Sequence, residues 1–164
     1  MAHVWLIGMM GTGKSTVGAL VAEQLQIPLV DVDALIVEHN RRTISEIFTE
    51  GEATFRALES ATIAAVATRD DAVIATGGGA VLDPSNVDTM RESGVTVLLT
   101  ATLEQIECRL RGAASRPLLT DAEALSRIYE TREHLYAESA DIVIDTTDLD
   151  AASAAEEVLK CVAT

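Results

Sequence analysis

The residues best suited to chemistry lie near the start of the chain, in the stretch LIGMMGTGKSTVG. They match the pattern G-x-x-x-x-G-K-[ST], at Gly8, Gly13, Lys14 and Ser15. Glycines allow a tight turn whose backbone N–H groups point at phosphate oxygens, and a following helix adds its positive end. We expect Lys14 to reach the β- and γ-phosphates and the Ser15 hydroxyl to bind Mg²⁺. The pattern follows an apolar run and precedes a segment of helical period, so it predicts a site for ATP or GTP.

A phosphate loop alone does not separate kinases from switches and motors. The chain lacks the N/T-K-x-D motif with which switch GTPases read guanine, and its 164 residues are fewer than motor ATPases generally have. A short chain with one phosphate loop therefore favours a kinase that acts on a small molecule.

Two aspartates, Asp31 and Asp33, alternate at the end of an expected strand, 28–33. On a strand they would point the same way, near the sheet edge where ligands bind in open α/β sheets. Asp31 could hold Mg²⁺ through water, and Asp33 could orient an attacking hydroxyl or take its proton. The alternative is a solvated strand end whose acids begin the next helix. The pair alone leaves both interpretations open.

Arg56 and Glu59 are three residues apart and share one face of an expected helix. A guanidinium can grip a substrate carboxylate through two parallel hydrogen bonds, and Glu59 would hold Arg56 in place. The other interpretation is a surface ion pair, which contributes little to stability. Taken alone, the spacing favours the surface ion pair.

Three consecutive glycines, 77–79, follow an expected strand at 72–76. Glycine destabilises a helix or strand by roughly 0.5–1 kcal/mol relative to alanine, so three in a row call for a reason. A ligand that approaches the backbone closely would supply one, and a plain loop is the alternative.

Three further arginines lie later in the chain. Arg116 lies in 111–121, the best candidate for a mobile lid, where it could neutralise charge on the transferring phosphoryl group. Arg132, on the next helix, could offer a second fork to an anionic substrate, and Arg109 could stack on an adenine face. Each of them, taken singly, is more simply explained as a surface residue.

The elements that would position these residues alternate along the chain. Apolar β-rich runs predict five strands, at 3–8, 28–33, 72–76, 95–100 and 141–145. Helical stretches lie between them, and those at 43–48 and 102–111 begin with a capping pattern. A last helix is expected from about Leu149. This order predicts one α/β domain over 1–164, with a parallel sheet between two layers of helices.

Composition excludes several classes of partner. Acidic residues outnumber basic ones, 26 to 12, and the formal charge of −14 argues against nucleic acid and anionic membranes. No apolar run approaches the roughly 20 residues that cross a bilayer, and VWLIG is expected to be a core strand rather than a signal peptide. Cys108 and Cys161 fall at apolar positions of expected helices, where we expect them to pack. With no spaced His or Cys cluster, we expect no metal site made by the protein alone.

Taken together, the motifs GMMGTGKSTVG, DVD, TISEIF, FRALE, GGGAV, SRPLL and REHLY stand in the order and at the spacing of one family. From about Leu6 to Thr146 the chain resembles shikimate kinase, and the triple glycine with the RPLL lid is the most specific part of the match. The resemblance implies a nucleoside-monophosphate-kinase-like fold with strand order 2-3-1-4-5. It implies transfer of the ATP γ-phosphate to the 3-hydroxyl of shikimate, with Mg²⁺, by a monomer in cytoplasmic aromatic amino-acid biosynthesis.

The resemblance also implies roles for individual residues, with catalysis assigned to Lys14, Asp33 and Arg116. Nucleotide contacts are implied at Gly11, Thr12, Gly13, Lys14, Ser15, Thr16, Arg109 and Arg116, and Mg²⁺ contacts at Ser15 and Asp31. Acceptor contacts are implied at Asp33, Phe48, Phe55, Arg56, Glu59, Gly78, Gly79 and Arg132, with the acceptor-binding helices at about 33–60. In this assignment Asp33 meets the hydroxyls, the two arginines grip the carboxylate and Gly78 offers its N–H.

Two other functions compete with this one. A related kinase could act on another small polar acceptor such as gluconate, although the combination of Asp33, Arg56 and Arg132 disfavours it. A non-catalytic nucleotide-binding module could keep the fold, but such a chain should have lost at least one of the reacting residues.

Overall fold

The sheet has five parallel strands, as predicted from the sequence, and they stand in the order β2-β3-β1-β4-β5 that the family resemblance implies. The structure is a computed structural model that describes residues 2–112 and 122–163. The strands are β1 (His3–Ile7), β2 (Leu29–Asp31), β3 (Val73–Ala75), β4 (Gly94–Thr100) and β5 (Ile142–Asp145). The helices are α1 (Lys14–Leu25), α2 (Val32–Asn40), α3 (Ile44–Phe48), α4 (Glu52–Ala67), the 3-10 helix η1 (Ala80–Leu82), α5 (Pro84–Ser93), α6 (Leu103–Arg111), α7 (Ala122–Ser139) and α8 (Ala151–Val162).

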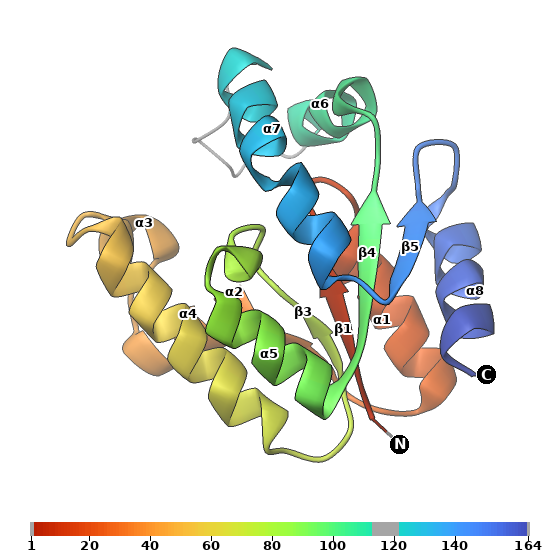
Figure 1. The fold of residues 1–164 in the computed structure, drawn as a ribbon, viewed down its shortest axis with the longest axis horizontal. Coiled ribbons are helices and arrows are strands. Elements are labelled where there is room, and N and C mark those ends of the chain that lie inside the picture. Colours follow the sequence, from red (N-terminus) through yellow and green to blue (C-terminus); the bar gives the residue numbers. More distant parts are fainter. Residues whose placement is uncertain (1, 113–121, 164) are drawn as a thin grey trace.

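Helices cover both faces of the sheet, and the alternation of side chains along β1 shows why (Figure 1). Val4 and Leu6 pack with buried residues of α1 and α8. Trp5 and Ile7 point the other way and pack with buried residues of α4, α5 and α7. A strand that is apolar on both faces is typical of a parallel sheet enclosed by helices, and it forms the centre of two cores.

The second strand is shorter than predicted, and this changes the positions of two acids. It ends at Asp31, which is the N-cap of α2 and accepts a hydrogen bond from the Ala34 N–H at 3.0 Å. Asp33 lies in the first turn of α2, so the prediction that both acids share one strand face is wrong. The physical reason is that a capping aspartate satisfies a free amide donor and favours the helix start.

The capping pattern at 43–48 is confirmed as a full capping box. The Thr43 hydroxyl accepts from the Glu46 N–H at 3.2 Å, and the Glu46 carboxylate accepts from the Thr43 N–H at 2.7 Å. The last helix begins at Ala151, slightly later than predicted, with Asp150 as its N-cap. Among the described helices, none is both long enough and apolar enough to span a membrane.

The two cysteines differ from the sequence-based prediction. Cys108 on α6 and Cys161 on α8 form no disulfide among the described residues, and their side chains are exposed rather than packed. The buried position of α6 is Ile106 and those of α8 are Ala154, Ala155 and Val158, so neither cysteine lies on the buried face of its helix.

Candidate active site

The phosphate loop lies between β1 and α1, at the carboxyl ends of the strands (Figure 1). Gly8 has a φ of 139° and Gly13 a φ of 97°, a region that favours glycine. At Gly8 space is also limiting, because a Cβ there would overlap the Leu99 carbonyl of the neighbouring strand β4. The Lys14 ammonium donates to the carbonyl oxygens of Gly8 at 2.7 Å and Met9 at 2.8 Å. The predicted loop is therefore formed, and its lysine lies over it.

Helix α4 begins at Gly51 without a side-chain cap but has Glu52 in its first turn, whereas helix α1 has neither a capping side chain among the described residues nor an acid there. The N-cap of α1 is Gly13. Side chains cap α2, α3, α5, α6 and α8, through Asp31, Thr43, Asp83, Thr102 and Asp150. The first amides of α1 therefore present donors and positive potential to an anion at the phosphate loop.

Ser15 and Asp31 meet beside this loop. The Ser15 hydroxyl donates to Asp31 Oδ2 at 3.0 Å, while Asp31 Oδ1 caps α2. A hydroxyl and a carboxylate are hard oxygen ligands of the kind Mg²⁺ takes next to nucleotide phosphates. The pair fits the predicted metal contacts, and the cap explains how Asp31 is held although it is not on the strand face.

Arg56 and Glu59 form an ion pair at 2.7 Å, and Glu59 is fully buried. Arg56 also contacts Glu52 at 3.3 Å and keeps 22% of its side chain exposed. Burial raises the pKa of Glu59 above its ordinary 4.5, and the Arg56 guanidinium opposes that rise. The spacing alone favours a surface ion pair, but Glu59 is fully buried, so this pair is not on the surface. A buried carboxylate without its partner would be an uncompensated charge, and the pairing with Arg56 is therefore important.

The triple glycine admits these side chains from α2 and α4. A Cβ at Gly77 would lie 2.9 Å from Asp33 Oδ1 and from Glu59 Oε2, and one at Gly79 would overlap the Arg56 guanidinium. Neither glycine has a positive φ, so it is space rather than conformation that requires glycine. The close approach predicted here is therefore made first by the protein's own side chains.

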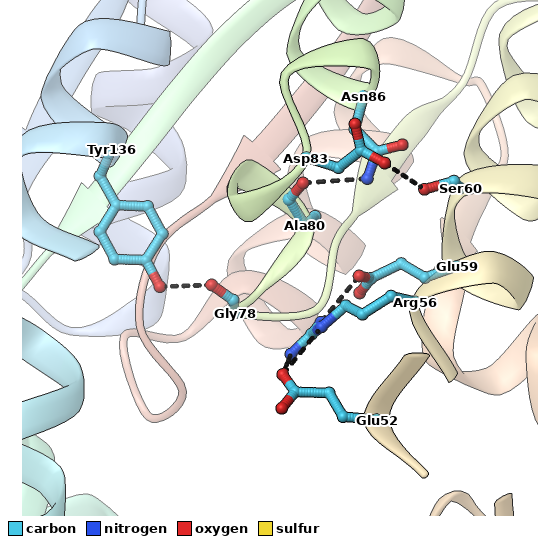
Figure 2. Close-up of polar contacts among 9 residues, drawn as sticks. All are labelled: Glu52, Arg56, Glu59, Ser60, Gly78, Ala80, Asp83, Asn86 and Tyr136. Atoms are coloured by element: carbon cyan, nitrogen blue, oxygen red, sulfur yellow. Dashed lines mark hydrogen bonds and ion pairs between the residues drawn. The ribbon is translucent and has the colours of Figure 1, made fainter. Parts of the chain in front are cut away.

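Helix α7 closes the other side of the glycine segment (Figure 2). The buried Tyr136 donates from its hydroxyl to the Gly78 carbonyl at 2.5 Å. Arg132, one helical turn earlier, lies with Nη1 3.4 Å from the position of a Gly78 Cβ. Sequence analysis did not single out Tyr136; its spacing of four from Arg132 was the available signal.

Two phenylalanines form the apolar part of the site. Phe48 and Phe55 stack with ring centroids 4.6 Å apart and an interplanar angle of 25°. Arg56 Cζ lies 5.2 Å from the Phe55 centroid, so the ring also supports the guanidinium. The end of α3 and the start of α4 therefore give the arginine an aromatic neighbour.

Arg109 lies on the other side of the phosphate loop. Its guanidinium donates to the carbonyls of Gly11 at 3.2 Å and Thr146 at 2.7 Å, and to the Thr146 hydroxyl at 3.1 Å. It thus joins α6 to the phosphate loop and to the segment after β5. Arg116 and most of the predicted lid lie outside the described residues; only Arg111 and Gly112 of that stretch are described.

The described part of the predicted site therefore converges at one edge of the sheet. Gly11, Thr12, Gly13, Lys14, Ser15 and Thr16 lie in the phosphate loop and the start of α1. On the acceptor side, four side chains lie around the triple-glycine segment, which includes Gly78 and Gly79; they belong to Asp33, Arg56, Glu59 and Arg132.

Comparison with known proteins gives one consistent result. The family model for shikimate kinase matches residues 10–163. Shikimate kinases of Geobacter sulfurreducens and Geobacter metallireducens are each 46% identical, the first over 99% of this chain and 89% of its own length, the second over 88% and 83%.

Solved structures agree in fold. A shikimate kinase from Acinetobacter baumannii in complex with shikimate superposes with a TM-score of 0.94 at 32% identity, over 99% of this chain and 93% of that one. A gluconokinase from Sinorhizobium meliloti reaches a TM-score of 0.67 at 19% identity over 99% and 91%, and this likeness shows the fold alone. The family match over nearly the whole chain, with the site described above, means that the chain belongs to the shikimate kinase family.

Proposed function

We propose that this chain transfers the γ-phosphoryl group of ATP to the 3-hydroxyl of shikimate, giving shikimate 3-phosphate and ADP. The observation that carries the proposal is Arg56, which is held by the buried Glu59 and stands against the glycine segment beside Asp33. A guanidinium fixed in this way presents a planar fork, which suits a carboxylate. The family membership and the shikimate complex of a relative support the same acceptor.

The acceptor carboxylate is gripped by Arg56 and Arg132, which approach the glycine segment from α4 and α7. Gly78 offers its backbone N–H, while Gly79 leaves room for the Arg56 guanidinium. Phe48 and Phe55 form the apolar wall of the pocket. Two positive forks and an apolar wall favour a small, ring-shaped acid.

The transfer itself requires an oriented hydroxyl and neutralised phosphate charge. Asp33 orients the 3-hydroxyl and accepts its proton as the oxygen attacks phosphorus. Lys14 moves from the loop carbonyls to the phosphate oxygens when nucleotide binds. Arg116, outside the described residues, keeps the role that the sequence predicts for it, on the transferring group.

Mg²⁺ is the metal that Ser15 and Asp31 would hold, because their paired oxygens suit a hard cation. When bound, Mg²⁺ supplies charge neutralisation to the β- and γ-phosphates. In the structure, one Asp31 oxygen holds the Ser15 hydroxyl and the other caps α2. The fold therefore positions both residues that would bind the metal.

The proposed setting is a cytoplasmic monomer whose partners are ATP and shikimate, with no nucleic acid or membrane. The charge of −14 supports the last point, because both of those partners need a basic footprint. Size-exclusion chromatography coupled to light scattering measures the molar mass and so tests the monomer directly. The mass of a dimer at micromolar protein concentration would contradict it.

The direct test is ADP release in a coupled assay with ATP and Mg²⁺. Shikimate should give a large acceptor-dependent rate, while gluconate and quinate should give little. Dependence on gluconate instead would identify a related small-molecule kinase. Nucleotide binding with no acceptor dependence would point to a binding module.

The role of Asp33 is tested by Asp33→Asn, which keeps the shape but loses the proton acceptor. We expect kcat to fall about 100-fold with nucleotide affinity unchanged, since general-base catalysis contributes typically 10²–10⁴-fold. Asp88→Asn, on the exposed face of α5, is the matched control and should keep normal turnover. Near-normal kcat in Asp33→Asn would remove Asp33 from this role.

A further inference from the structure

We infer that Tyr136 is a positioning residue for the acceptor site, whose hydroxyl fixes the glycine segment and Arg132 relative to each other. This inference rests on the proposed function, because it concerns the same pocket. The residue does not touch the reacting atoms; it acts through Gly78 and Arg132.

The glycine segment, residues 77–79, needs hydrogen bonds from other elements to hold its conformation. Glycines restrict the backbone least of all residues, so three in a row do not hold a shape by themselves. The segment's own 3-10 turn uses two carbonyls: Gly77 accepts from the Ala80 N–H at 3.2 Å, and Gly79 accepts from the Leu82 N–H at 3.1 Å. The Gly78 carbonyl is left for another element to bind.

The element that binds the Gly78 carbonyl is α7. The Tyr136 hydroxyl donates to the Gly78 carbonyl at 2.5 Å, across 58 positions of sequence (Figure 2). That carbonyl belongs to the Gly78–Gly79 peptide, so the hydrogen bond fixes the orientation of this peptide. The Gly78 N–H belongs to the preceding peptide, next to the one that is fixed. On the far side of the segment, Asn86 of α5 donates to the Ala80 carbonyl at 3.0 Å. Among the described residues, α7 thus binds the segment at Gly78 and α5 binds the adjacent Ala80, and of these two helices α7 carries the acceptor arginine Arg132.

Arg132 approaches Gly78 from the same helix as Tyr136. A phenol donates one hydrogen bond and can accept another. Arg132 Nη1 lies 3.4 Å, and the Tyr136 hydroxyl 3.5 Å, from the position that a Cβ on Gly78 would take, and Arg132 acts electrostatically on that hydroxyl. The hydroxyl thus binds the backbone of Gly78 at the place where Arg132 also approaches that residue.

The hydroxyl is also a dependable donor. Burial raises the pKa of Tyr136 above its ordinary 10, although Arg132 opposes the rise, so the O–H keeps its proton through the usual assay range. The ring is buried in the core, whereas the hydroxyl reaches the Gly78 carbonyl. The two parts of the side chain can therefore be separated by mutation.

The test is Tyr136→Phe, which keeps the ring and removes the hydroxyl. We expect the shikimate KM to rise about tenfold, as expected for one lost hydrogen bond, with the ATP KM unchanged. Tyr129→Phe removes a hydroxyl from the same helix, away from Gly78, and should leave both constants as in the wild type. Thermal unfolding of each variant shows whether the core is intact.

A double-mutant cycle separates positioning from a purely structural role. If Tyr136 acts through Arg132, then Tyr136→Phe adds much less to the shikimate KM in an Arg132→Ala background than in the wild type. Full additivity overturns the link to Arg132. An unchanged shikimate KM in Tyr136→Phe, or equal rises of both KM values with a lower Tm, overturns the inference. A wild-type chain without shikimate-dependent turnover would instead overturn the proposed function, so the two failures are distinguishable.

Discussion

Glu59 is the residue whose environment departs most from what its type suggests. It is fully buried, it pairs with Arg56, and its Oε2 faces Gly77. The sequence predicted the pairing from a spacing of three, but it did not predict the burial. The burial of Glu59 depends on the glycine segment, which follows β3 and packs against Glu59 on α4. These two parts of the chain are far apart in sequence, so no local pattern predicts their contact.

The raised pKa of Glu59 predicts how acceptor binding depends on pH. As pH falls through that pKa, Glu59 takes a proton, the ion pair with Arg56 weakens and the shikimate KM rises. The inflection lies above 4.5, whereas an ordinary carboxyl would titrate there or below. Measuring KM against pH in the wild type and in Glu59→Gln checks this, because the variant should lack that inflection. An identical pH profile in both would contradict it.

The same pKa has the opposite consequence for stability. A raised pKa means that the folded chain holds the proton more tightly than the unfolded chain. This contribution to the free energy of unfolding is therefore complete below 4.5 and is lost as pH rises through the folded pKa. Urea unfolding at several pH values should show a shallower decline in Glu59→Gln.

Gly79 gives a second prediction at this scale. A Cβ there would overlap the Arg56 guanidinium, so Gly79→Ala should displace Arg56 and raise the shikimate KM about tenfold or more. The ATP KM should stay the same, since the phosphate loop is not touched. In an Arg56→Ala background the alanine has nothing to displace and should add little. A similar added loss in that background would show that Gly79 acts otherwise.

At the scale of elements, what the sequence could foresee depended on how local each signal was. The five strands and the capping box of α3 rest on patterns of a few residues and are confirmed; the strand order, which the family resemblance implied, is confirmed as well. The end of β2 was missed, because Asp31 can either extend a strand or cap a helix, and only packing decides. Tyr136 was missed because a helical tyrosine looks the same whether or not its hydroxyl reaches a distant carbonyl.

The capping box of α3 is the element-scale prediction. Thr43→Ala removes a cap and should lower the free energy of unfolding by about 1 kcal/mol. Because α3 ends at Phe48, the variant should also raise the shikimate KM slightly. Thr89→Ala is the control, since its hydroxyl donates only to a carbonyl within α5. Equal urea midpoints for the two variants would count against the cap.

The whole molecule carries an excess of negative charge. With a net charge of −14, self-repulsion opposes the compact state. Exposed ion pairs such as Arg127–Glu123 and Lys160–Glu157 act in the other direction, but each contributes little. Screening therefore removes more repulsion than attraction.

Added salt should accordingly stabilise the chain. We expect the Tm to rise between about 0.01 M and 0.5 M KCl, as the Debye length falls from about 30 Å to well below 10 Å. NaCl should act alike, because screening depends on ionic strength. A Tm that falls over this range would show that attractive pairs dominate.

The uncapped start of α1 has a consequence for the lifetime of the protein. No side chain among the described residues caps α1, so the phosphates of a bound nucleotide supply acceptors for its first amides. A ligand at 100 times its Kd adds about 2.7 kcal/mol to the free energy of unfolding. A chain without bound nucleotide, whether ATP or ADP, therefore unfolds more readily and should be cut faster by a protease that acts on the unfolded chain. Occupancy of the site then affects the lifetime of the protein as well as its turnover.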